Sequence, residues 1–144
     1  METKFNFKSQ ICTDKNQSER LLALGLKPET ADMCWMYGEV LSCNPPELNV
    51  DIPAWSLYRL MEMIQEVCPQ VVISFHRVDI RSNVKRIAYS FDSCDNLYDN
   101  IIDCIEWLIK EGYFNKEYLV NQAEIEEHCK GVLEYLDYIR GEEE

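Results

Sequence analysis

The chain has 144 residues, of which 47% are hydrophobic and 28% are charged, a balance that predicts one globular domain with its own core. The first residues lack the apolar stretch of a signal peptide, and no run approaches the roughly 20 apolar residues of a membrane span, so we expect a cytoplasmic protein with no membrane partner. The net charge of −12 argues against direct binding to nucleic acid.

The seven cysteines give no sign of a shared structural role. Their number is odd, and no two have the C-x-x-C spacing of zinc ribbons and thioredoxin-like motifs. We therefore interpret most of them as reduced, buried, small hydrophobic side chains. They lie at positions 12, 34, 43, 68, 94, 104 and 129.

Capping signals predict two helices near the N-terminus. Asn16 and Glu19 have the spacing of a capping box, and Gly25 is a typical residue just beyond a helix end. Thr30 then offers the N-cap of a second, short helix. The segment 40–52 is rich in polar residues and proline, which predicts a surface loop.

The stretch "IPAWSLYRLMEMIQEVC" predicts the next helix, which Pro69 ends. Its apolar residues recur at helical spacing and form one buried stripe. The stripe consists of Leu57, Leu60, Met61, Ile64 and Cys68.

The pattern then changes to a β-hairpin over about 71–91, with a turn at Ser82-Asn83. In this register Val78 faces Ile87, His76 faces Tyr89, and all four point toward the core. The opposite face is basic, and it carries Arg77, Asp79, Arg81 and Arg86.

The segment 95–112 predicts a strong amphipathic helix that Gly112 ends, with Asp99 and Asp103 on its outside. A last amphipathic helix is expected from Asn115, over about 116–140, followed by an acidic tail at 141–144. The elements together predict an α+β fold in which helices pack on one face of a small antiparallel sheet, within a single domain over 1–144.

The sequence offers only weak candidates for chemistry. His76 is expected on the core face, where a structural histidine is the simpler interpretation. His128 and Glu124 lie four residues apart on the last helix, but two ligands do not complete a zinc site. No nucleophile motif or phosphate-binding loop occurs, so we assign no catalytic residue, metal ligand or cofactor and lean against an enzyme.

The basic hairpin face leaves two interpretations open. Arg77, Arg81 and Arg86 could contact phosphate groups, with tyrosines nearby for stacking. They could instead pair with acidic residues of the segment 92–144, which has a net charge of −11, within one chain or across a dimer. We favour pairing.

Several short blocks carry a resemblance. They are Gln17-Ser18, Leu24-Gly25-Leu26, Thr30-Ala31-Asp32-Met33, Pro53-Ala54-Trp55-Ser56-Leu57, and the late-helix residues Asn100, Asp103 and Trp107. In these blocks the chain resembles a family of small uncharacterised proteins encoded by gut anaerobes and by their phages and mobile elements. The resemblance implies a biological context and no particular chemistry.

These observations favour a cytoplasmic accessory protein that binds a protein partner, which could be a second copy of itself. The candidate interaction surface consists of Trp35, Trp55, Arg77, Arg81 and Arg86, because exposed aromatic and arginine side chains concentrate binding energy. One alternative is an acidic mimic of nucleic acid that occupies a basic DNA-binding protein. Another is a small metal-dependent or thiol enzyme.

Overall fold

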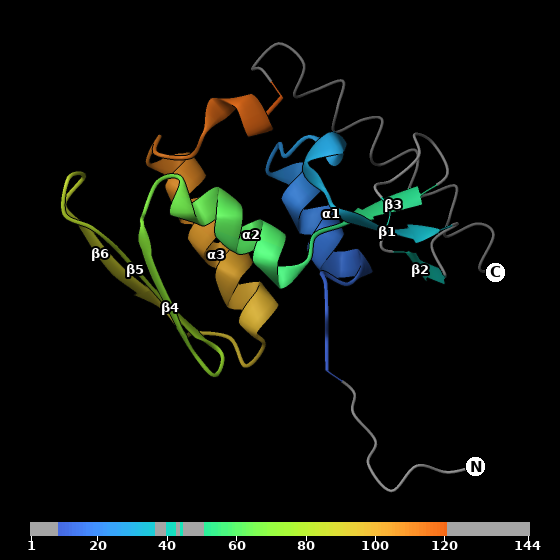
Figure 1. Cartoon of the computed structure of the whole chain (residues 1–144), viewed down its shortest axis with the longest axis horizontal. Helices are drawn as coiled ribbons and strands as arrows, with labels where there is room; N and C mark the ends of the chain where they lie inside the picture. The colour runs from blue at the N-terminus through green and yellow to red at the C-terminus, as the bar shows by residue number, and fades with distance from the viewer. Residues whose placement is uncertain (1–8, 37–39, 43, 45–50, 121–144) are drawn as a thin grey trace, which may run out of the picture.

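The chain folds as two three-stranded antiparallel sheets on opposite sides of a layer of helices (Figure 1). The computed structural model describes residues 9–36, 40–42, 44 and 51–120. The larger sheet contains β4 (Gln70–Ser74), β5 (Arg77–Ser82) and β6 (Ile87–Phe91), with β5 in the middle. The smaller sheet contains β1 (Met33–Met36) between β2 (Val40–Ser42) and β3 (Asp51–Ala54). The predicted α+β class is confirmed, but the prediction contained one sheet and the structure has two.

Three α-helices form the layer between the sheets: α1 (Lys15–Ala23), α2 (Leu57–Gln65) and α3 (Leu97–Lys110). α1 and α3 lie side by side and run in the same direction. The order of their contacts shows this, since side chains on successive turns of α1 bond to successive turns of α3. Gln17 bonds to Asp99 at 3.0 Å, and Arg20, one turn later, pairs with Asp103 at 2.8 Å.

The capping box of α1 is real but lies two residues before the predicted one. Asp14, not Asn16, is the N-cap, and its carboxylate accepts a hydrogen bond from the backbone N–H of Gln17 at 2.7 Å. The Gln17 side chain accepts one from the Asp14 N–H at 3.0 Å. The predicted ends are confirmed at Gly25 (φ +105°) and at Gly112, which follows α3 (φ +79°). Glycine tolerates these left-handed conformations at little steric cost.

The short helix predicted after Thr30 is wrong. A 3₁₀ turn (Pro28–Thr30) comes first, and the following residues form β1, which pairs with strands on both sides. The predicted loop over 40–52 contains β2 and the start of β3. Pro53, predicted to open a helix, lies in β3, an edge strand that can accommodate a residue without an N–H. Strands of only about four residues, which are stabilised by pairing with distant segments, are too short to show a recognisable alternation of apolar and polar residues in the sequence.

The predicted hairpin register is also wrong, although the predicted assignment of its faces is largely right. The segment expected as one strand folds back at Phe75-His76, so the region has three strands. Val78 therefore pairs with Phe91 instead of Ile87, and Ile80 pairs with Tyr89. The shift of four residues preserves the alternation, because strand side chains repeat every two residues.

The main core lies between the larger sheet and the helices. The inner face of the sheet contributes Val78, Ile80 and Ile87, which are all buried. α2 and α3 cover this face with apolar stripes, and the α2 stripe departs from the prediction because Met63 is buried whereas Leu57 and Met61 are only partly buried. The fully buried members are Leu60, Met63, Ile64, Ile101, Ile102, Cys104, Ile105 and Leu108. Burial of apolar area of this kind is the main stabilising term of the fold.

Asn100 links the larger sheet to α3. Its fully buried amide donates hydrogen bonds to the carbonyl of His76 at 2.6 Å and to that of Cys94 at 3.0 Å. Its oxygen accepts one from the Cys94 N–H at 3.0 Å. One side chain thus fixes both the β4–β5 turn and the connection from β6 to α3.

The last described residues do not begin the predicted C-terminal helix. Asn115 caps a 3₁₀ turn (Lys116–Tyr118), after which Leu119 forms an isolated bridge with Leu26. The predicted helix over about 116–140 is therefore wrong at its start, and its remainder and the tail at 141–144 lie outside the described residues. Of the described helices, none is long and apolar enough to cross a bilayer.

The substitution Asn100→Ala should lower the free energy of unfolding by at least about 2 kcal/mol, because it leaves buried backbone groups of His76 and Cys94 unpaired. Asn83→Ala is the matched control, since Asn83 is exposed in the β5–β6 turn and should cost less than about 0.5 kcal/mol. Chemical denaturation of both variants measures the difference. Equal effects would contradict the role assigned to Asn100.

Candidate functional site

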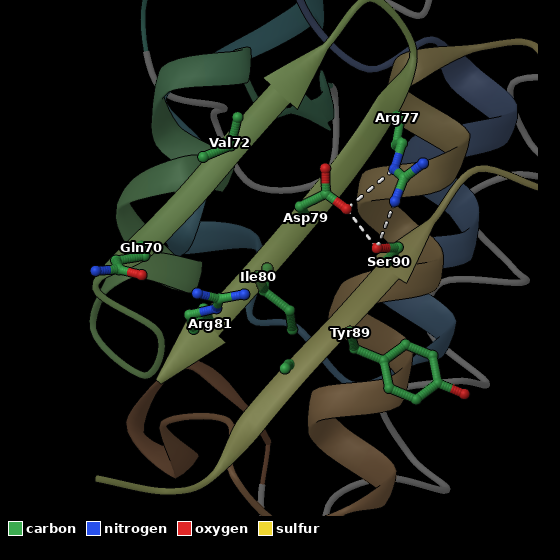
Figure 2. Close-up of a pocket in the computed structure, with 9 residues that line it drawn as sticks. Gln70, Val72, Arg77, Asp79, Ile80, Arg81, Tyr89 and Ser90 are labelled. Carbon is green, nitrogen blue, oxygen red and sulfur yellow. Dashed lines mark hydrogen bonds and ion pairs between the residues drawn. The ribbon is translucent and has the colours of Figure 1, made fainter. Parts of the chain in front are cut away.

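The larger sheet has one face that no described helix covers, and we call it the outer sheet face (Figure 1). The side chains that lie along it include seven from three strands: Gln70, Val72, Arg77, Asp79, Arg81, Ala88 and Ser90. Together with Ile80 and Tyr89 they line a shallow, open depression of about 480 Å³ (Figure 2). The depression is open and is lined by both apolar and polar surface, which suits contact with a macromolecule better than enclosure of a small ligand.

A charged network occupies the upper part of this face in Figure 2. Arg77 Nε donates to Asp79 Oδ1 at 3.0 Å, and Arg77 Nη2 donates to Ser90 Oγ at 3.1 Å. The Ser90 hydroxyl donates to the same carboxylate oxygen. This hydrogen bond and the neighbouring guanidinium hold the pKa of Asp79 below its usual value, because both favour the charged carboxylate.

Arg81 and Arg86 do not share this network. Arg81 is exposed on β5, and Arg86 lies in the β5–β6 turn with φ +56°. Within the described part of the chain, neither arginine forms an ion pair with the acidic residues that follow β6. Arg77 pairs instead with Asp79 of its own strand, and pairing of the arginines with acidic residues of 121–144 or of a second copy stays a prediction.

The tip of the β4–β5 hairpin combines backbone strain with an exposed aromatic ring. Phe75 is 91% exposed and has φ +60°, whereas His76, the other turn residue, does not have a positive φ. A positive φ at only the first central residue is the pattern of a type II′ turn, in which glycine is preferred. A bulky residue there costs about 1–3 kcal/mol and persists only when the surroundings enforce it.

Sequence reasoning missed Phe75 because the turn itself carries none of the usual turn residues. Neither glycine, asparagine, aspartate nor proline occurs at positions 75 and 76. The Asn100 bond to the His76 carbonyl supplies the constraint that such residues would supply locally. The only available signal was an aromatic residue beside a histidine in the middle of a long β-type segment.

His76 lies in the turn and not opposite Tyr89 on the core face, so its predicted placement is wrong. Its ring packs edge-on against Phe75 with the ring centroids 5.4 Å apart. Its Nδ1 atom is buried and has no hydrogen-bond partner among the described residues. His128 and Glu124, the other weak candidates, lie outside the described residues.

The two tryptophans do not form the predicted interaction surface. Trp55 is 0% exposed, and its Nε1 donates to the Thr30 hydroxyl at 2.9 Å. Trp35 is partly buried, and its Nε1 donates to the Thr13 carbonyl at 3.1 Å. Both side chains hold the smaller sheet and its flanking turn in place, so of the predicted surface only the arginines are exposed.

The described cysteines are reduced, and four of the five (Cys12, Cys34, Cys68 and Cys104) are buried as predicted. Burial raises the pKa of the Cys68 and Cys104 thiols, which keeps them protonated and unreactive. Cys43 and Cys129 lie outside the described residues. Over the described ranges, no group of three or more histidine, cysteine, aspartate or glutamate side chains could hold a metal ion.

The acidic residues of α3 are engaged with other parts of the fold. Asp99 accepts a hydrogen bond from Gln17, and Asp103 pairs with Arg20. Glu106 contacts Arg20 at 3.2 Å and Lys110 at 3.0 Å. All three carboxylates thus take part in the contact between α1 and α3.

Comparison of the chain with protein-family models, with curated proteins and with solved structures gave no match.

The Asp79 network predicts a specific titration behaviour. In the wild-type chain the carboxyl of Asp79 should titrate below the usual range for aspartate, and Ser90→Ala should raise its pKa because the largest favourable hydrogen bond is lost. Carboxyl chemical shifts followed by NMR from pH 7 downward measure both values. An unchanged pKa in the variant would contradict the network.

Proposed function

We propose that this chain is a cytoplasmic, non-catalytic accessory protein that binds a protein partner through the outer rim of its larger sheet. The binding rim consists of the hairpin tip at Phe75 and the adjoining outer sheet face. The resemblance to proteins of phages and mobile elements supports an accessory role of this kind.

The strained, exposed Phe75 is the observation that carries the proposal. An aromatic ring that is 91% exposed gains little from folding, and its backbone conformation costs free energy. Glycine would relieve the strain and would remove the exposed ring. A residue that is unfavourable on both counts is best explained by an interaction in which the ring becomes buried, because local rules of folding are broken mainly at functional sites.

The outer sheet face supplies the polar part of such an interface. Arg81 extends from β5 opposite Gln70, and Val72, which is 56% exposed on β4, lies opposite Asp79 on the same face. An apolar anchor flanked by an arginine and by hydrogen-bonding side chains is typical of protein-binding surfaces. On this face Arg77 and Arg81 outnumber Asp79, so the rim is basic on an otherwise acidic chain.

The acidic mimic of nucleic acid receives less support from the described residues. A mimic needs an uninterrupted row of free carboxylates, whereas Asp99, Asp103 and Glu106 bond to side chains of their own fold. We therefore retain the interaction role as the proposal.

The variant Phe75→Gly separates binding from stability. We expect it to raise the free energy of unfolding by about 1 kcal/mol, since relief of the positive-φ strain exceeds the entropic cost of glycine. We also expect it to lose the partner proteins that tagged wild-type chain captures by cross-linking in host lysate, quantified by mass spectrometry.

Val84→Gly is the matched control, because Val84 is 95% exposed at the opposite turn and does not have a positive φ. This variant should be slightly destabilised and should retain the captured proteins. Capture that is unaffected by Phe75→Gly, or equally reduced by both variants, would contradict the proposal.

A further inference from the structure

β4 is an edge strand whose outward backbone groups can be identified. It pairs only with β5, and the two strands are joined by the two-residue turn Phe75-His76. In such a hairpin the residues that flank the turn, Ser74 and Arg77, form a hydrogen-bonded pair, and such pairs alternate along the ladder. The N–H and C=O groups of Val71 and Ile73 therefore point away from β5, toward the free edge.

This edge lacks the features that normally prevent strand addition. Proteins commonly protect exposed edges with charged residues, proline or bulges, but β4 reads Gln-Val-Val-Ile-Ser. Val72 is 56% exposed at its centre, and Phe75 is 91% exposed at its end. Within the described residues, no backbone hydrogen bond to the outward side of β4 is formed.

From this geometry we infer that the partner of the binding rim is a second copy of this chain, paired antiparallel along β4 with Val72 on the two-fold axis. The inference rests on the proposed function and names its partner. In this register Val71 of one copy lies opposite Ile73 of the other, and all four outward residues exchange hydrogen bonds. Two three-stranded sheets would become one sheet of six strands.

The side chains support this register. The two Val72 side chains meet in a non-hydrogen-bonded pair, the arrangement in which cross-strand side chains are closest. Pro69, which is exposed, comes opposite Phe75 of the second copy, so the strained aromatic tip gains an apolar neighbour. Arg81 of one copy and Arg77 of the second copy are separated by three strand spacings, roughly 14 Å. This distance exceeds the Debye length of about 8 Å at physiological salt, so the repulsion between the two arginines is largely screened.

The opposite edge, β6, is the natural competitor, and its side chains fit this role less well. Its outer-face residues are Ala88 and Ser90, and the Ser90 hydroxyl already bonds to Asp79. Its central residue, Tyr89, stacks on Trp107 of α3 at a centroid distance of 5.0 Å. Tyr89 is also 50% exposed, but it points to the inner face of the sheet, so on the outer face the large exposed apolar side chain is Val72 of β4.

Two charge insertions on the same face distinguish the edges. Val72→Lys places two ammonium groups across the proposed axis and should weaken self-association at least about tenfold. Ala88→Lys adds the same charge to the same face at β6 and should leave self-association unchanged. Sedimentation of the full chain at concentrations from about 1 μM to 1 mM measures self-association. This range covers the dissociation constants expected for a short interface.

Hydrogen exchange provides a readout that does not depend on a substitution. The amides of Val71 and Ile73 should exchange more slowly at high than at low concentration of wild-type chain, whereas the amides of Ala88 and Ser90 should not change. Circular dichroism of both lysine variants serves as the control for folding.

A wild-type chain that stays monomeric throughout this range overturns the second copy as partner. So does dimerisation that Ala88→Lys abolishes and Val72→Lys does not. If a monomeric chain still captures a different protein in a Phe75-dependent manner, the interaction role stands and only the identity of the partner is wrong. A chain that stays monomeric and also captures no other protein in a Phe75-dependent manner overturns both proposals.

Discussion

The hydrogen bonds of Asn100 are the constraint on which the exposed side of the molecule depends. This one buried amide bonds to the carbonyl of His76 in the β4–β5 turn and to Cys94 in the connection between β6 and α3. Because the turn carbonyl is fixed from the core, the turn can tolerate a phenylalanine at positive φ. The strain at Phe75 is therefore balanced by a buried contact about 25 residues away in the sequence, and the ring is presented rigidly to solvent.

A consistent division of roles follows from this arrangement. The helices bury the inner face of the larger sheet, and the polar contacts between α1 and α3 occupy the acidic residues that could otherwise present a negative surface. The tryptophans secure the smaller sheet through hydrogen bonds to Thr13 and Thr30. Phe75, Val72 and Arg81 are exposed together at the outer rim of the larger sheet, whereas the other large exposed apolar residues, among them Tyr58 and Val84, lie on other parts of the fold.

The sequence predicted those features that local physics determines. The apolar face of α3, most of the α2 stripe and the glycine ends at Gly25 and Gly112 were correct, because helix periodicity and left-handed conformation depend on neighbouring residues. β1 and the hairpin register were not predictable in this way. Both depend on pairing with distant strands, and the turn at Phe75-His76 is held by a residue of α3 and not by its own sequence. Of the candidate site, Arg77 and Arg81 were identified, whereas Arg86 lies away from it in the β5–β6 turn, and Phe75 and the free β4 edge emerged only with the fold.

The central claim is that Phe75 and the β4 edge form an interface between two copies of the chain. Isotope-filtered NMR on a mixture of labelled and unlabelled full-length chains tests it most directly. The account predicts intermolecular contacts between Val71 and Ile73 and between the Phe75 ring and Pro69. Intermolecular contacts confined to other residues, or none at concentrations where the protein is dimeric by sedimentation, would contradict it.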